Sequence, residues 1–99
     1  MSDSIEIVRH EGEGISTFIS VKLQHDGGVV IQAVDLGDVP KRFWGSSGYE
    51  YLVDVPAAAT GRLLLLLLKE KYAGNVGAVE DFREFCKSND IAHQFSTWR

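Results

Sequence analysis

The sequence ISVKLQHDGGVVIQAV, residues 19–34, decides the fold because it predicts a β-hairpin. Ile19, Val21 and Leu23 alternate with polar residues, which is the period of a half-buried strand. An Asp-Gly pair between two apolar runs is the strongest short signal for a hairpin turn. The stretch therefore predicts two antiparallel strands joined by a tight turn.

The length of this turn determines which residues pair across the hairpin. A two-residue loop would place Val21 opposite Gln32 on the inward face, where an unpaired amide costs about 1–3 kcal/mol. A three-residue loop, residues 25–27 with Gly27 in the left-handed region, makes every inward pair apolar. Those pairs are Leu23 with Val29, Val21 with Ile31, and Ile19 with Ala33. We therefore predict the three-residue loop.

Strand alternation continues on both sides of the hairpin. Residues 4–7 alternate before a turn-forming EGEG sequence, and residues 49–55 alternate until Pro56 withdraws the next ladder donor. Between the hairpin and this last strand, residues 38–44 begin with a helix-capping aspartate and have room for one or two helical turns. The first half of the chain therefore predicts four strands.

Residues 57–73 predict a helix because they are rich in alanine and leucine and end at Gly74, where a left-handed cap costs little. Leu64, Leu65 and Leu68 share an uncharged arc of about 100°. We expect this arc to lie on the sheet, in the core, and to pack on Val21, Ile31 and Val53.

Three further leucines, Leu63, Leu66 and Leu67, lie on the opposite side of that helix. One sheet cannot bury both sides, so this patch needs a second cover. The cover is either the second helix or a partner subunit, and the sequence does not choose between them. The patch is therefore a candidate interface.

A second helix is predicted from residue 78, with Asn75 as its capping residue. Val79, Phe82, Phe85 and Cys86 share its apolar face. Residues 91–98 return to alternation and predict a last strand. The chain therefore predicts one α+β domain over residues 1–99, with two layers: an antiparallel sheet of four or five strands and two helices packed on one face. The predicted order is strand–strand–strand–strand–helix–helix–strand.

Several segments of the second half resemble small uncharacterised bacterial α+β domains. These segments are FWGSS at 43–47, YEY at 49–51, the helix after Val-Pro at 55–56, and FSTW at 95–98. The resemblance covers about residues 36–98 and implies no activity.

Composition narrows the classes of function. The net charge is −4, which argues against nucleic-acid binding, because phosphate contact needs a clustered basic surface. The longest apolar run, residues 63–68, is much shorter than the roughly 20 residues of a membrane span. A single cysteine and an N-terminus without the pattern of a secretion signal predict a reducing, cytoplasmic location.

No catalytic residue, metal site or cofactor is predicted. The histidines, His10, His25 and His93, lack the short fixed spacing of metal ligands. Cys86 lies on the apolar stripe of its helix, so we expect it to pack in the core rather than to react.

The strongest candidate binding residues are four aromatic side chains close together in sequence: Phe43, Trp44, Tyr49 and Tyr51. Tryptophan and tyrosine are enriched at the energetic centres of protein interfaces. We expect a non-enzymatic protein-binding domain, either an inhibitor of the immunity or antitoxin type or a subunit of an assembly, that binds a protein partner or forms a homodimer. The alternative is a small ligand-binding domain or minor enzyme that uses the loop from Trp44 to Tyr51.

Overall fold

The computed structural model describes residues 3–37 and 48–97. Its elements follow the predicted order: strands first, then helices. They are β1 (Ser4–Glu11), β2 (Ile15–Leu23), β3 (Val29–Gly37), β4 (Gly48–Val55), α2 (Ala57–Tyr72) and α3 (Ala78–Ser88). The α+β class is confirmed. The short helix expected at residues 38–44 lies outside the described residues.

The sheet has four strands, and residues 91–97 form no fifth strand. The last strand predicted from alternation is therefore wrong over these residues. The physical reason lies in α3: the backbone N–H of Ile91 donates to the carbonyl oxygen of Cys86 at 2.9 Å, and the Phe95 ring lies under the Arg83 guanidinium at 4.1 Å. Contacts with the helix hold this segment instead of a strand ladder.

Contacts divide the chain into two compact units, Met1–Leu64 and Leu65–Arg99. The first unit contains the sheet and the first half of α2. The second contains the rest of α2, α3 and the C-terminal segment. The interpretation of residues 1–99 as a single domain stays a prediction.

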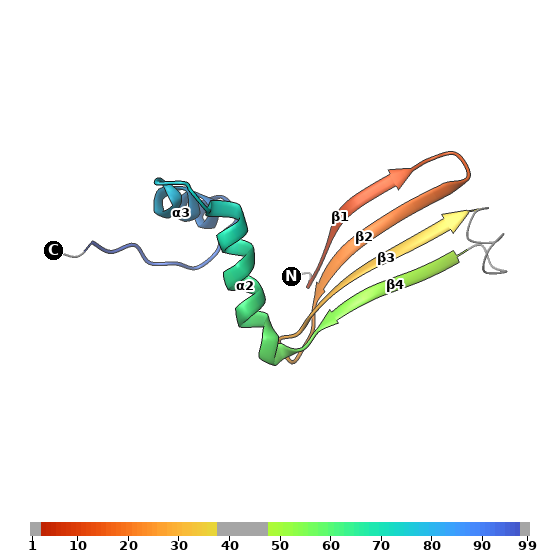
Figure 1. The fold of residues 1–99 in the computed structure, drawn as a ribbon, viewed down its shortest axis with the longest axis horizontal. Helices are drawn as coiled ribbons and strands as arrows, with labels where there is room; N and C mark the ends of the chain where they lie inside the picture. Colours follow the sequence, from red (N-terminus) through yellow and green to blue (C-terminus); the bar gives the residue numbers. More distant parts are fainter. Residues whose placement is uncertain (1–2, 38–47, 98–99) are drawn as a thin grey trace. The chain divides into compact units, whose positions relative to one another are not determined.

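All neighbouring strands pair antiparallel in the order β1-β2-β3-β4, as Figure 1 shows. The central hairpin has the predicted register, with Leu23 opposite Val29 and Val21 opposite Ile31. Its loop is the predicted three-residue one. The Gln24 N–H donates to the Gly28 carbonyl at 2.8 Å, the Gly27 N–H donates to the Gln24 carbonyl at 3.0 Å, and Gly27 has φ +94°. Glycine meets this φ without a Cβ clash.

A single residue, Pro56, connects β4 to α2. The first turn of the helix is anchored to the hairpin, because the Thr60 hydroxyl donates to the Gly27 carbonyl at 2.8 Å. Within this first unit, Leu64 is 56% exposed, Ile31 is 40% exposed and Val53 is 62% exposed. The prediction that Leu64 is buried in a core with these strand residues is therefore wrong within the first unit. The helix ends near Gly74 (φ +79°), as predicted.

The second unit has a small apolar centre of its own. Cys86 is 2% exposed, which confirms that its thiol packs in the interior. The rings of Tyr72 and Phe82 meet edge to face at 6.0 Å, joining the end of α2 to α3. Asn75 holds the turn between the helices: its Oδ1 accepts the N–H of Gly77 at 2.8 Å. The N-cap of α3 is Gly77 itself, so the capping role predicted for Asn75 is wrong by two positions.

Candidate functional site

Strand pairing places the largest apolar side chains on one face of the sheet. Residues directly opposite each other on neighbouring strands point to the same side, and alternate residues along a strand do too. Three cross-strand rows result: Ile5–Val21–Ile31–Val53, Val8–Ile19–Ala33–Tyr51, and Leu23–Val29–Val55. We call these three rows the apolar face.

The opposite side of the same strands carries charged and polar residues between its apolar ones. Its central rows are Ser20–Gln32–Leu52, Lys22–Val30–Asp54 and Phe18–Val34–Glu50. We call this side the mixed face. Leu52 of the mixed face is 55% exposed, close to the 62% of its chain neighbour Val53 on the apolar face. The two faces therefore differ in composition more than in exposure.

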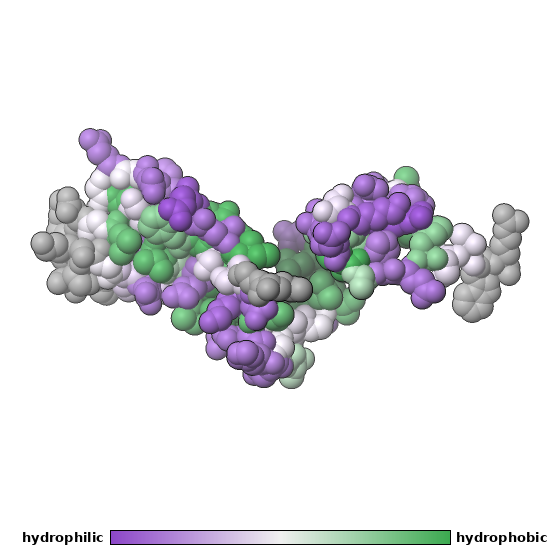
Figure 2. Space-filling model, turned by 180° about the vertical axis from the view of Figure 1, so that it is seen from behind, coloured by the Kyte–Doolittle hydropathy of each residue, from purple (hydrophilic) through white to green (hydrophobic). Residues whose placement is uncertain are grey.

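The centre of the apolar face has a shallow hollow of about 200 Å³. Ala33 forms its floor because its side chain is shorter than those around it. The surrounding side chains on this face are Ile19, Ile31, Tyr51 and Val53. Hydrophobic residues reach the molecular surface between hydrophilic ones, as Figure 2 shows in green and purple. The hollow has the size and lining to receive one apolar side chain.

A polar row closes one end of the apolar face. It is His10–Thr17–Asp35–Tyr49, next to the row that contains Tyr51. The Thr17 hydroxyl donates to Asp35 Oδ1 at 2.8 Å, and the rings of Tyr49 and Tyr51 lie 5.5 Å apart. Partial desolvation raises the pKa of the Tyr51 phenol above its ordinary 10.0, and the negative charge and hydrogen bond of Asp35 raise this pKa further.

The structure brings two of the four candidate aromatic residues together. Tyr49 and Tyr51 stand at the polar end of the apolar face. Phe43 and Trp44 lie outside the described residues, so their role stays a prediction. Ile31 and Val53 were assigned to the interior by sequence reasoning. Whether these two side chains are exposed depends on what packs on the sheet. Alternation in the sequence does not show this.

The leucine patch belongs to α2. Leu66 and Leu67 are each about half exposed in the second unit, so α3 does not cover them. The sequence allowed either the second helix or a partner subunit to bury the leucine patch. Burial by a partner subunit stays a prediction.

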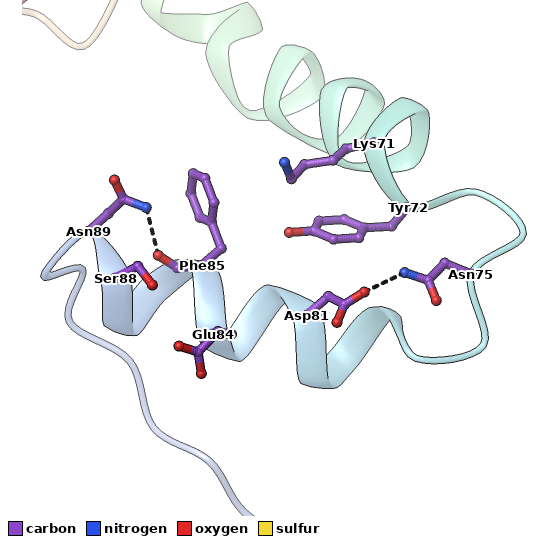
Figure 3. Close-up of a pocket in the computed structure, with 8 residues that line it drawn as sticks. All are labelled: Lys71, Tyr72, Asn75, Asp81, Glu84, Phe85, Ser88 and Asn89. Carbon is purple, nitrogen blue, oxygen red and sulfur yellow. Dashed lines mark hydrogen bonds between the residues drawn. The ribbon is translucent and has the colours of Figure 1, made fainter.

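The second unit also has an open hollow of about 450 Å³ between α2 and α3 (Figure 3). The Lys71 ammonium lies 5.6 Å from the centre of the Tyr72 ring and 5.1 Å from that of Phe85. These distances suit cation–π attraction. The two rings therefore hold a cation supplied by the chain itself, which strengthens the contact between the helices.

Among residues 3–37 and 48–97, no group of three or more His, Cys, Asp or Glu side chains is placed to hold a metal ion. Neither α2 nor α3, the helices of the described chain, has the length and hydrophobicity that a membrane crossing requires.

Comparisons with known protein families, with curated proteins and with solved structures found no match to this chain.

Proposed function

We propose that this chain is a small protein-binding domain without catalytic activity, which works through the apolar face. The single observation that supports the proposal is the exposure of that face. Within the first unit, Ile5, Leu23 and Val53 are each at least half exposed and lie in adjoining rows. Contiguous apolar patches of this kind on soluble proteins mark interaction sites.

The polar row at the end of the face supports a specific contact rather than general stickiness. Interfaces combine an apolar centre with a polar rim that fixes orientation. Here Tyr51 supplies an aromatic anchor beside the hollow, and the hydrogen-bonded pair of Thr17 and Asp35 supplies the rim. A partner with an apolar projection next to hydrogen-bond donors fits this arrangement.

Two kinds of protein use a small domain in this way: an inhibitor of the immunity or antitoxin type, and a subunit of an assembly. The acidic net charge of −4 favours a basic rim on the partner in either case. Both kinds bind through the same surface, so one experiment tests the proposal for both.

A small-ligand function at the loop from Trp44 to Tyr51 is the second candidate. The paired rings of Tyr49 and Tyr51 beside the carboxylate of Asp35 favour it. A ligand held there would depend on Tyr49, whereas protein capture through the apolar face would depend on Val53.

The test compares two neighbouring residues on opposite faces. Val53→Glu places a charge on the apolar face, and Leu52→Glu places the same charge on the mixed face at similar exposure. Each tagged full-length variant is used to capture partner proteins from cell extract, with a differently tagged wild-type chain included. We expect Val53→Glu to abolish capture and Leu52→Glu to preserve it. Equal capture by the two variants would refute the proposed function.

A further inference from the structure

We infer that the hollow of about 450 Å³ between α2 and α3, the interhelical hollow, binds a methylated ammonium group, and that Lys71 occupies the cation position in the free chain. All residues that line this hollow belong to the second unit, so the site is separate from the apolar face and the inference goes beyond the proposed function. It is carried by two aromatic rings that already face a cation, by the carboxylates beside them, and by the weak hold on Lys71.

The two aromatic rings define the cation position. Tyr72 ends α2 and Phe85 belongs to α3, and Figure 3 shows both rings close to the Lys71 side chain. The Lys71 ammonium lies 5.6 Å from the centre of the Tyr72 ring and 5.1 Å from that of Phe85. Phe82 contacts the Tyr72 ring edge to face at 6.0 Å, which restricts how that ring can turn. A cation at this position is therefore attracted by both rings.

The charges around the hollow favour a cation over an anion. Among the described residues that line it, Asp81 and Glu84 supply two carboxylates and Lys71 supplies one ammonium. Asp81 Oδ2 accepts the side-chain N–H of Asn75 at 2.8 Å. Within residues 3–37 and 48–97, the Glu84 carboxylate has no hydrogen-bond or ion-pair partner, so its charge is available to a ligand. A positively charged ligand therefore gains from the lining of the hollow.

Lys71 is held weakly enough to be displaced. Within the second unit its side chain is exposed, and in the described part of the chain its ammonium contacts the two rings but forms no ion pair or side-chain hydrogen bond. A lysine ammonium is strongly hydrated and sits on a flexible stem. Its attraction to the rings therefore competes with water, and the side chain can turn away when a ligand binds.

The chemistry of the hollow selects a methylated ammonium among cations. Methyl groups on the nitrogen present apolar surface, so contact with the rings removes this surface from water in addition to the cation–π attraction. A metal ion fits poorly, because in the part of the chain that the structure describes no three His, Cys, Asp or Glu side chains converge to hold one. The same methylated group occurs in small quaternary ammonium compounds and in trimethylated lysine side chains.

The first experiment titrates the purified full-length chain with tetramethylammonium chloride and follows the NMR signals of Tyr72 and Phe85. Potassium chloride at the same concentrations controls for ionic strength. We expect saturable shifts with tetramethylammonium only. Shifts of equal size in both salts, or shifts that do not saturate, would overturn the inference. Choline and a trimethyllysine peptide are then titrated in the same way, and the tighter binder identifies the source of the group. Failure of both to bind would also overturn it.

The second experiment tests the displacement of Lys71 with variants of equal charge. Lys71→Gln removes the chain's own cation from the rings, whereas Lys69→Gln removes the same charge from the last turn of α2 at a residue that does not line the hollow. We expect Lys71→Gln to bind tetramethylammonium about two- to fivefold more tightly than Lys69→Gln, because no cation–π contact has to be broken first. Equal affinities would overturn the assignment of Lys71 to the cation position.

The third experiment removes one ring. Phe85→Leu should abolish the saturable binding of tetramethylammonium, whereas Phe95→Leu should retain it. Phe95 is the matched control because its ring lies under the Arg83 guanidinium and, within the second unit, is 43% exposed against 42% for Phe85. Equal binding by the two folded variants would overturn the inference. If Phe85→Leu does not fold, Glu84→Gln at an exposed position replaces it, and weaker binding is expected than for Glu80→Gln, which lies outside the hollow. Equal binding by these two would again overturn the inference.

Discussion

The two faces of the sheet are formed by the same four strands and differ in the types of residue that point to each face. Along β4, Tyr51 and Val53 point to the apolar face, whereas Glu50, Leu52 and Asp54 point to the mixed face. Charged residues interrupt the mixed face, so water can solvate it. The apolar face has no charged residue in its three central rows, so contact with another surface stabilises it. Exposure alone therefore does not identify a binding surface, but exposure combined with row composition does.

The largest expected effect comes from damage to the sheet itself, which should remove both faces together. Gly37 has φ +134°, and a Cβ there would collide with the carbonyl oxygen of Gly14. We expect Gly37→Ala to lower the free energy of unfolding by roughly 2–4 kcal/mol, measured by urea denaturation. Gly61→Ala is the control, because a Cβ there meets open space within α2. It should raise stability by up to about 1 kcal/mol. A loss at Gly61 as large as at Gly37 would contradict the backbone account.

A change at the centre of the apolar face should weaken association without unfolding the chain. Ile31→Ala truncates a side chain beside the hollow. We expect a loss of about 2 kcal/mol in the free energy of partner binding, or roughly a thirtyfold rise in the Kd for the captured partner, measured by titration calorimetry. Leu52→Ala removes a similar side chain from the mixed face and should change Kd less than about threefold. If both variants weaken association equally, the difference between the faces has no role in binding.

The sequence predicted the four strands and the hairpin register because both depend on local patterns. Alternation from Ile19 to Leu23 and the Asp-Gly turn allow one register with apolar pairs only. The prediction of a strand at residues 91–97 failed because the backbone of Ile91 and the ring of Phe95 contact α3, and contacts with the preceding helix leave no periodic signal in the sequence. Tyr49 and Tyr51 were found as site candidates from aromatic density. Ile31 and Val53 were missed because alternation shows which residues share a face and not what covers it.

A smaller effect is expected where the polar row borders the apolar face. Thr17→Val removes the hydroxyl that donates to Asp35. We expect a loss of about 1 kcal/mol in the free energy of unfolding, because the partly buried carboxylate of Asp35 loses one of its hydrogen bonds. Ser16→Val, one residue earlier and on the opposite side of β2, is the matched control. Equal losses in both variants would show that the hydrogen bond contributes nothing specific.

The smallest expected effect is on the titration of Tyr51, followed by ultraviolet absorbance in a chain with Tyr49 and Tyr72 replaced by Phe. The negative charge of Asp35 raises the pKa of this phenol above 10.0, so Asp35→Asn should lower the pKa. Because the folded state binds the phenolic proton more tightly, its contribution to stability is complete below pH 10 and is lost as pH rises through the folded pKa. If the Tyr51 phenol titrates at the same pH in Asp35→Asn, Asp35 does not contribute to its raised pKa.

The most direct measurement is methyl NMR of the full chain with a soluble paramagnetic probe, which reports the accessibility of both faces in one sample. In the single chain, Leu52 and Val53 are similarly exposed, at 55% and 62%. If the apolar face is the surface that binds a protein partner, then in the complex with the captured partner the probe will broaden the Leu52 methyl signals and leave those of Val53 and Ile31 sharp. Broadening of Val53 as strong as that of Leu52 would contradict this account.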